Sequence, residues 1–200
     1  MSNLTVKGNT SGTGTVILEA PNTNTNRPIT LPDATATLAT TADIPSVNPF
    51  TLGTAVASTS GTAIDFTGIP SWAKRVTVML NGVSISGTTT FLMQLGDSGG
   101  VETTGYIGSG ESNNTYLNPT NGFALSGTTA ATQPWYGSLV LTNITGNSWV
   151  LSGFISSPTN RVGCSAGSKT LSDSLDRIRI TTASGTDTFG AGTINISYEG

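Results

Sequence analysis

Short runs of alternating apolar and polar residues, separated by turn residues, predict β-strands along most of the chain. Residues 75–80 alternate in this way, with Val76 and Val78 on one face. The dipeptide Asn81-Gly82 that follows is the strongest two-residue hairpin signal in the sequence. We therefore expect residues 83–86 to return as the second strand of a hairpin.

The same pattern recurs at short intervals through the rest of the chain. Further strands are predicted at residues 54–57, 63–66, 91–95, 138–142, 148–152, 177–181 and 193–198. Turns at Thr145-Gly146-Asn147 and at Ser184-Gly185 are expected to join the last four of these strands into two hairpins. One short helix is predicted, at residues 170–175. Strands this closely spaced are typical of an all-β fold, here a β-sandwich or a jelly roll.

The first 46 residues differ from the remainder and form a predicted N-terminal arm. Their apolar residues are sparse, and those expected to take part in assembly are Ile17, Leu18, Ile29, Leu31 and Leu38. So few apolar side chains do not offset the backbone entropy lost on ordering, about 1–2 kcal/mol per residue. We therefore expect residues 1–46 to be an extended N-terminal arm that lies on its own domain, on copies of itself or on a partner, and residues 47–200 to be the head domain.

The composition indicates which residue types face solvent, and it argues against nucleic acid and membranes as partners. Only 10% of the 200 residues are charged, against roughly 25% in an average chain, so Thr, Ser and Asn replace charges on the exposed faces. A net charge of −3 with 8 Lys and Arg residues argues against nucleic acid. No apolar stretch approaches the ~18 residues of a membrane-spanning helix, and the N-terminus lacks the pattern of a signal peptide. The protein is therefore expected to be made in a cytoplasm and not to insert into a membrane.

Catalysis is not expected, because the sequence contains no histidine. Histidine is the commonest general base and metal ligand, and the usual partner of a nucleophilic serine or cysteine. Residues 96–100 read Gly-Asp-Ser-Gly-Gly, as around the nucleophile of trypsin-like proteases, but Ser98 has no imidazole to take its proton. We interpret this stretch as a glycine-rich turn capped by Asp97. No catalytic residue, metal ligand or cofactor is predicted.

The charged residues leave alternatives open. Asp97, Glu102 and Glu111 share one loop-rich stretch, where a pair of carboxylates would support glycoside cleavage and the same oxygens would suit Ca²⁺. Their spacing favours neither. Arg177 and Arg179 lie on one face of a predicted strand, which is either solvated or pairs with carboxylates in a contact between subunits.

The aromatic residues divide into expected core and expected surface. Those inside apolar runs are expected in the core: Phe66, Trp72, Phe91, Trp149 and Phe154. Tyr106 and Tyr116 instead fall in a Gly-, Ser- and Asn-rich stretch, and Trp135-Tyr136 opens a strand. Aromatic rings among short hydrogen-bonding side chains are how many proteins hold sugars, so these four residues are predicted glycan or receptor contacts. The alternative is that they pack under the loops as part of the core.

The head sequence resembles a module found at the distal ends of tailed-bacteriophage fibre proteins. The resemblance covers most of residues 47–200 and is carried by residues 60–79, 81–84, 94–106, 175–182, 185–189 and 194–196. In the arm, residues 29–40 are similar to an ITLP…GTLAT element of phage fibre shafts, with Ala36 where glycine is usual.

This resemblance implies a structural protein on the surface of a phage particle, made in the host cytoplasm. The implied partners are further copies of the chain, in a homotrimer, and capsid, collar or tail proteins of the particle. Residues 1–46 are then expected to be an attachment or oligomerisation arm that adds strands to neighbouring subunits. The implied task is that of a short fibre or spike whose head touches glycan on the host surface. Fibres of this type are usually longer, so a trimeric capsid decoration protein that stabilises the head of the particle is the alternative. An enzyme that degrades surface polysaccharide is a third.

Overall fold

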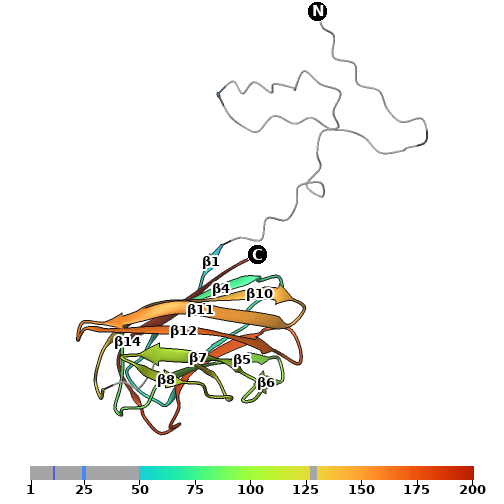
Figure 1. Cartoon of the computed structure of the whole chain (residues 1–200). Coiled ribbons are helices and arrows are strands. Elements are labelled where there is room, and N and C mark those ends of the chain that lie inside the picture. Colours follow the sequence, from blue (N-terminus) through green and yellow to red (C-terminus); the bar gives the residue numbers. More distant parts are fainter. Residues whose placement is uncertain (1–10, 12–23, 26–49, 127–129) are drawn as a thin grey trace, which may run out of the picture. The chain divides into compact units, whose positions relative to one another are not determined.

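The computed structural model describes residues 11, 24–25, 50–126 and 130–200. In this part of the chain there are fourteen β-strands and no helix, and the strands form two antiparallel sheets that pack face to face (Figure 1). The predicted all-β, sandwich-like fold is therefore confirmed. The five residues predicted for assembly in the arm lie outside the described residues: Ile17, Leu18, Ile29, Leu31 and Leu38.

Nine strands form the large sheet. In spatial order they are β1 (Thr51–Leu52), β14 (Phe189–Glu199), β4 (Arg75–Ile85), β10 (Trp135–Thr145), β11 (Ser148–Ser157), β12 (Arg161–Thr170), β7 (Ile107–Ser112) and β8 (Thr115–Leu117), while β2 (Val56–Ala57) also pairs with β14. Because β14 and β1 are paired, the C-terminus lies beside the start of the head (Figure 1).

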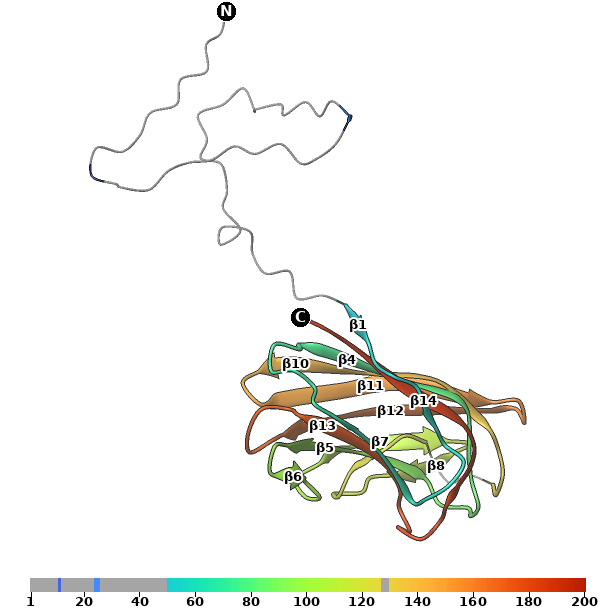
Figure 2. The same cartoon turned by 180° about the vertical axis from the view of Figure 1, so that it is seen from behind.

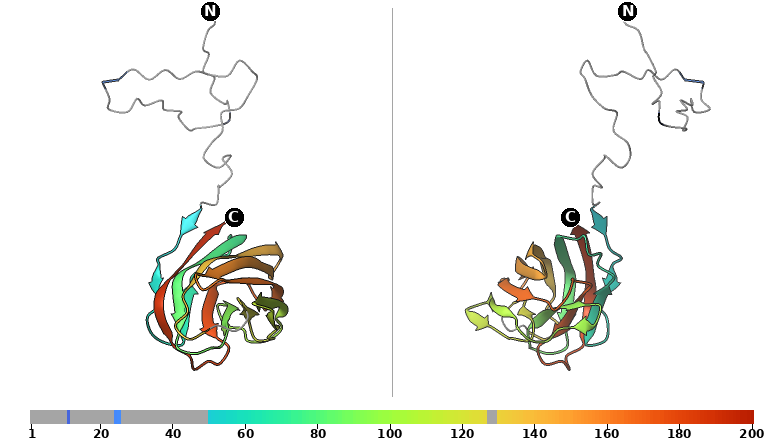
Figure 3. Two further views of the ribbon diagram at one scale, coloured as in Figure 1. Left: turned by 60° about the vertical axis from the view of Figure 1, so that its left-hand side comes forward. Right: turned by 90° about the vertical axis from the view of Figure 1, so that its right-hand side faces the viewer.

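Five strands form the small sheet, which is visible from behind in Figure 2. In spatial order they are β3 (Ala63–Thr67), β13 (Arg177–Thr182), β5 (Phe91–Asp97) and β6 (Gly100–Val101), while β9 (Phe123–Ala124) also pairs with β5. Figure 3 shows that the large sheet curves around the small one.

The core fills the space between the two sheets because the strands alternate apolar and polar positions. Val78 of β4 and Ile178 of β13 are fully buried from opposite sheets. Phe91 of β5 stacks on Phe189 of β14 with ring centroids 6.3 Å apart, which joins the sheets further. Full burial of a side chain of this kind contributes roughly 1.5–3 kcal/mol. Of the aromatic residues expected in the core, Phe66, Phe91 and Trp149 belong to it and Trp72 packs against it half-buried.

The predicted hairpin at Asn81-Gly82 is wrong, because both residues lie inside β4, which continues to Ile85. On β10, Tyr136 pairs with Asn81 and Trp135 pairs with Val83, so Gly82 is an extra residue in a β-bulge. Gly82 has a φ of +70°, the left-handed conformation that also makes Asn-Gly a hairpin signal. The same local conformation bends a strand when long strands pair on both of its sides, as β10 and β14 do here.

The two predicted hairpins near the C-terminal half have different outcomes. The one around Gly146 is confirmed, since it joins β10 to β11 and Asn143 Nδ2 donates to the Gly146 carbonyl at 2.8 Å. The one around Ser184-Gly185 is wrong, because β13 pairs with β3 and β5 of the small sheet whereas β14 belongs to the large sheet. Residues 183–188 therefore cross from one sheet to the other, and this crossing buries Ile178 and Ile180 against the opposite layer.

The predicted helix at residues 170–175 is also wrong, since Thr170 ends β12 and residues 171–175 are irregular. Leu171 and Leu175 are both buried, which explains the helix-like spacing. The backbone between them is held instead by side chains: the Ser172 N–H donates to Glu102 Oε1 at 2.7 Å. In the described ranges, none of the secondary structure is a helix long and apolar enough to cross a membrane.

The bulge in β4 depends on a close approach of two backbones, and this yields a prediction. Gly192 of β14 has a φ of +97°, and a Cβ on it would lie 2.4 Å from the Gly82 carbonyl carbon and oxygen. We expect Gly192→Ala to lower the free energy of unfolding by about 2–4 kcal/mol, measured by urea denaturation. Gly190→Ala on the same strand is the control, because its Cβ would meet only Ser84 Oγ, at 3.5 Å. Equal losses for the two variants would contradict this explanation of the bulge.

Candidate functional site

A row of side chains crosses the outer face of the large sheet at one end. The register places Phe154 of β11 opposite Cys164 of β12, Cys164 opposite Glu111 of β7, and Glu111 opposite Tyr116 of β8. Residues paired in this way share one face of a sheet. Phe154 and Tyr116 thus stand three strand spacings apart, roughly 14 Å, with Cys164 and Glu111 between them.

The two rings flank a shallow groove of about 440 Å³, in which Cys164 and Glu111 lie between them. Phe154 is 67% exposed and Tyr116 is 70% exposed, so both rings are available to a ligand. The next row along the sheet holds only small side chains, Ser109, Ala166 and Ser152. These small residues form the floor of the groove beside the rings. We call this set of residues the aromatic groove.

A tight turn places Tyr116 next to Glu111. Asn113 and Asn114 form the two-residue loop between β7 and β8, and both have positive φ, +52° and +61°. This is the backbone of a type I′ hairpin, which asparagine adopts more readily than most residues. The Asn114 N–H donates to Glu111 Oε1 at 2.8 Å, and Cys164 Sγ lies 3.8 Å from Oε2. The carboxylate is therefore held by its own hairpin at the centre of the groove.

The structure separates the four predicted glycan contacts into two exposed and two buried residues. Tyr116 lines the aromatic groove, and Tyr136, 42% exposed, lies on the same face of the sheet on β10. Trp135 and Tyr106 are buried, 0% and 3% exposed, so they do not present their rings to a ligand. The alternative interpretation, packing in the core, is correct for these two residues.

Each burial has a local cause. Trp135 precedes Tyr136 in β10, and neighbouring residues of a strand point to opposite faces, so an exposed Tyr136 places Trp135 inside. The Tyr106 hydroxyl accepts the Leu95 N–H at 2.6 Å and donates to the Glu102 carbonyl at 2.9 Å, which draws the ring under the loop. There it packs edge-on against Phe123, with centroids 4.9 Å apart. Burial raises the pKa of the Tyr106 hydroxyl, so it stays protonated.

The prediction that Phe154 belongs to the core is wrong, because its side chain lies on the surface. The signal that could have identified it is the phase of β11: Trp149, Leu151 and Ile155 all face inward, which places even-numbered residues outward. An apolar run around Phe154 obscured this alternation. The sequence indicated Glu111 only as a candidate catalytic or calcium-binding carboxylate. Its position between two rings results from strand pairing, which the local pattern does not show.

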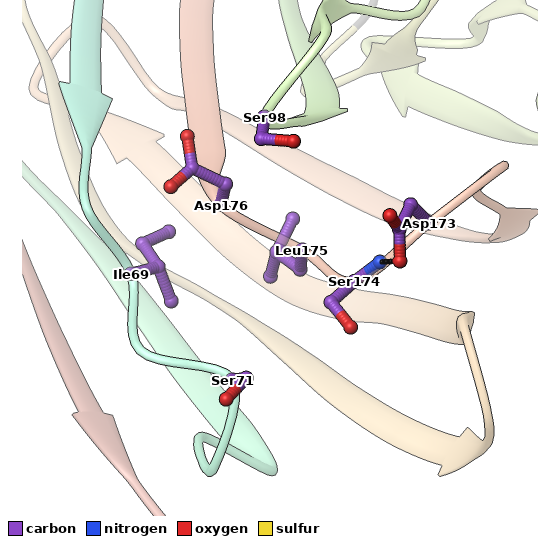
Figure 4. Close-up of a pocket in the computed structure, with 7 residues that line it drawn as sticks. All are labelled: Ile69, Ser71, Ser98, Asp173, Ser174, Leu175 and Asp176. Carbon is purple, nitrogen blue, oxygen red and sulfur yellow. Dashed lines mark hydrogen bonds between the residues drawn. The ribbon is translucent and has the colours of Figure 1, made fainter.

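The Gly-Asp-Ser-Gly-Gly stretch forms the predicted turn. Asp97 ends β5 and its Oδ1 accepts the Gly99 N–H at 2.8 Å. Ser98 lines a pocket of about 310 Å³ together with Asp173 and Asp176 (Figure 4). Asp173 accepts the N–H of the adjacent Ser174 at 2.7 Å, and no histidine exists in the chain to activate the serine. The pocket thus lacks the arrangement that a serine nucleophile needs.

Arg177 and Arg179 pair with carboxylates of the same chain. Arg177 binds Asp176 at 2.9 Å and donates to the Ser98 carbonyl at 3.3 Å, so it ties the turn to β13. Arg179 donates from two nitrogens to the two oxygens of Asp65 on β3, both at 2.7 Å. Such bidentate pairs are the strongest form of this contact. Both guanidinium groups therefore have partners within the small-sheet region of their own chain.

Asp97 and Glu102 come together although their spacing in the sequence did not indicate it. The Ser172 hydroxyl lies 2.7 Å from Asp97 Oδ2 and 2.7 Å from Glu102 Oε1. Lys169, only 5% exposed, forms an ion pair with Glu102 and lies over the Tyr106 ring, with Nζ 5.5 Å from its centroid. We call Asp97, Glu102, Lys169 and Ser172 the carboxylate network.

The electrostatics of the carboxylate network do not suit an acid catalyst. The hydrogen bond from Ser172 lowers the pKa of Asp97, aided by the Gly99 N–H. Burial raises the pKa of Glu102, but hydrogen bonds from Lys169 and Ser172 outweigh it and leave this pKa below its ordinary value. A glycoside-cleaving acid needs a raised pKa instead. Within residues 50–126 and 130–200, no group of three His, Cys, Asp or Glu side chains is arranged to hold a metal ion.

The lowered pKa of Glu102 leads to a stability prediction. A carboxyl whose pKa is lower in the folded state stabilises the fold above its ordinary value of 4.5, and this contribution is lost as the pH falls through the folded pKa. At pH 7 we expect Glu102→Gln to reduce the free energy of unfolding by about 2–4 kcal/mol, because buried Lys169 loses its counter-charge. The difference from wild type should shrink below roughly pH 4.5 in chemical denaturation. Glu111→Gln is the matched control and should change little; an undiminished difference at pH 3 for Glu102→Gln would contradict the prediction.

Comparison with known proteins identifies no relative of this chain. No protein-family model matches the chain, no curated protein matches it, and no solved structure matches it.

Proposed function

We propose that the chain is a structural protein on the surface of a bacteriophage particle, a short fibre or spike whose head binds neutral glycan of the host surface. The observation that carries the binding role is the aromatic groove, with two exposed rings and a carboxylate held between them. The sequence resemblance supports the location on the particle. Attachment is assigned to residues 1–46, and a homotrimer is the proposed assembly.

The chemistry of the groove favours sugars among possible ligands. Aromatic rings offer a flat apolar surface to the C–H face of a sugar, and a fixed carboxylate accepts hydrogen bonds from its hydroxyls. Glu111 keeps acceptor capacity beyond its bond with the Asn114 N–H, since a carboxylate has about four lone-pair sites. The roughly 14 Å between the ring-bearing strand positions suits an oligosaccharide better than a single sugar.

The charge of the groove favours a neutral ligand. Glu111 is the one charged side chain among the residues that line it. Its negative charge would repel carboxylated or phosphorylated glycans at short range. The serines of the floor, Ser109 and Ser152, add short hydroxyl groups that donate or accept as the ligand requires.

A binding role is preferred to an enzymatic one because of how the carboxylates are used. Asp97 and Glu102 are engaged by Ser172 and Lys169 and have lowered pKa values. Glu111 lies in the groove, but its neighbours there are Cys164, small residues and the two rings, with no second carboxylate. Retaining and inverting glycosidases both require such a pair.

The adhesion role is tested by removing the two rings. Phe154→Ala combined with Tyr116→Ala should weaken binding to an array of immobilised neutral glycans at least tenfold, because stacking supplies much of the contact. The free energy of unfolding should stay within about 0.5 kcal/mol of wild type, since both side chains are exposed. Ile144→Ala, which removes another exposed apolar side chain (63% exposed) outside the groove, is the control. Unchanged glycan binding by the double variant would exclude the groove as the adhesion site.

The attachment role is tested by deleting residues 1–46. The head should remain soluble and folded, because its core lies within residues 50–200, but it should no longer join phage particles in a reconstitution assay. Incorporation of the truncated chain would show that the arm is not the attachment element. Counting copies per particle separates the alternatives, since a number in the hundreds would favour capsid decoration over a fibre.

A further inference from the structure

We propose that a second pocket, at one end of the large sheet, binds the carboxylate of an acidic sugar. It has a volume of about 410 Å³ and lies between the segment that enters β10 and the turn from β11 to β12. Its polar lining consists of Thr132, Gln133, Thr159 and Arg161, and Ala130 and Pro134 form its apolar walls. The inference deepens the adhesion role proposed above by naming a second class of sugar, at residues separate from the aromatic groove.

Gln133 supplies the first argument. Its side chain is 6% exposed and lines the pocket, yet Nε2 has no hydrogen-bond partner among the residues that the structure describes. The other end of the amide is fixed, because Oε1 accepts the Ala130 N–H at 3.2 Å and the Gln133 N–H donates to the Ala130 carbonyl at 3.1 Å. Buried donors without partners cost free energy and are rare in folded proteins. A ligand oxygen in the pocket would provide the missing acceptor.

Arg161 supplies the charge. It is the first residue of β12 and is half-buried in the lining of the pocket. Arg161 is the charged side chain among the residues that line the pocket. A guanidinium group offers a planar fork of donors that matches a carboxylate. The hydroxyls of Thr132 and Thr159 suit the remaining hydroxyl groups of a sugar.

The backbone of Thr132 shows that the pocket wall is held in an unusual conformation. Thr132 has a φ of +62°, a region that β-branched residues rarely adopt. Its N–H donates to the Ile85 carbonyl of β4 at 2.8 Å, which fixes this geometry against the large sheet. Residues in such conformations cluster at ligand sites, where the surrounding structure holds them in place. The volume is that of a small-ligand site, suited to a single sugar.

The two proposed sites therefore differ in charge as well as in place. The aromatic groove carries a carboxylate and suits neutral sugars, whereas this pocket carries a guanidinium group and an unpaired amide donor and suits a sugar acid. Inorganic phosphate would also fit the planar fork and the hydroxyls, but unlike a sugar acid it has no apolar surface to place against Ala130 and Pro134.

The test is calorimetric titration of the full chain with glucuronic acid, N-acetylneuraminic acid, glucose and inorganic phosphate. We expect the two sugar acids to bind, and glucose and phosphate to bind at least tenfold more weakly. Arg161→Ala should weaken binding of the sugar acids at least tenfold, and Arg161→Lys should restore only part of it. Gln133→Glu keeps the oxygen that accepts from Ala130 and replaces the amide donor by an acceptor, so it should also abolish binding.

Two controls make the result specific. Arg75→Ala removes an arginine that pairs with Glu199 elsewhere on the large sheet, and it should leave the affinity for sugar acids unchanged. The double variant Phe154→Ala, Tyr116→Ala should also keep this affinity, which separates failure of this pocket from failure of the aromatic groove. Equal affinity for wild type and Arg161→Ala, or binding of phosphate as tightly as of the sugar acids, would overturn the proposal.

Discussion

The close contact of backbones across the inner face of the large sheet is the constraint on which the aromatic groove depends. A Cβ at Gly110 of β7 would lie 2.3 Å from the Ala124 carbonyl oxygen, and one at Gly163 of β12 would lie 2.9 Å from Ser126 Cβ. Ser165 strengthens this contact by donating to the Ala124 carbonyl at 2.6 Å. Because the β9 segment fills the inner face of these strands, their larger side chains are on the outer face, where they form the groove.

The same structure explains how a chain with so few charges uses them. Asp65, Asp97 and Glu102 are committed to contacts that join distant parts of the head, with Arg179, Ser172 and Lys169 as their partners. These contacts link the turn after β5 to the end of β12 and the edge strand β3 to β13. They support a structural interpretation of these acids. Glu111 and Arg161 are the charged residues that line the two proposed binding sites.

Together, the two proposed sites would select polysaccharides that contain both neutral and acidic sugars, which neither site would select alone. Surface polysaccharides combine neutral and acidic sugars, and discrimination among them is a difference of affinities. A groove with a fixed carboxylate would disfavour acidic units. A pocket with Arg161 and the Gln133 amide, whose Nε2 has no partner among the described residues, would disfavour units that lack an acceptor. Both sites are built on or against long strands of the large sheet, which hold side chains more firmly than free loops do.

Alternation and turn residues are local signals, and they were enough to predict the all-β class, strands such as β5, β10, β11 and β13, the turn at Asp97 and the hairpin at Gly146. They did not predict β7, β8 or β12. Nor did they determine that Asn81-Gly82 is a bulge, that β13 and β14 lie in different sheets, or that the segment around Ser172 is irregular. That Phe154 faces solvent while Trp135 and Tyr106 are buried became clear from the packed fold alone. The physical reason is that alternation assigns residues to two faces of a strand, but pairing and packing with distant strands decide which face is covered.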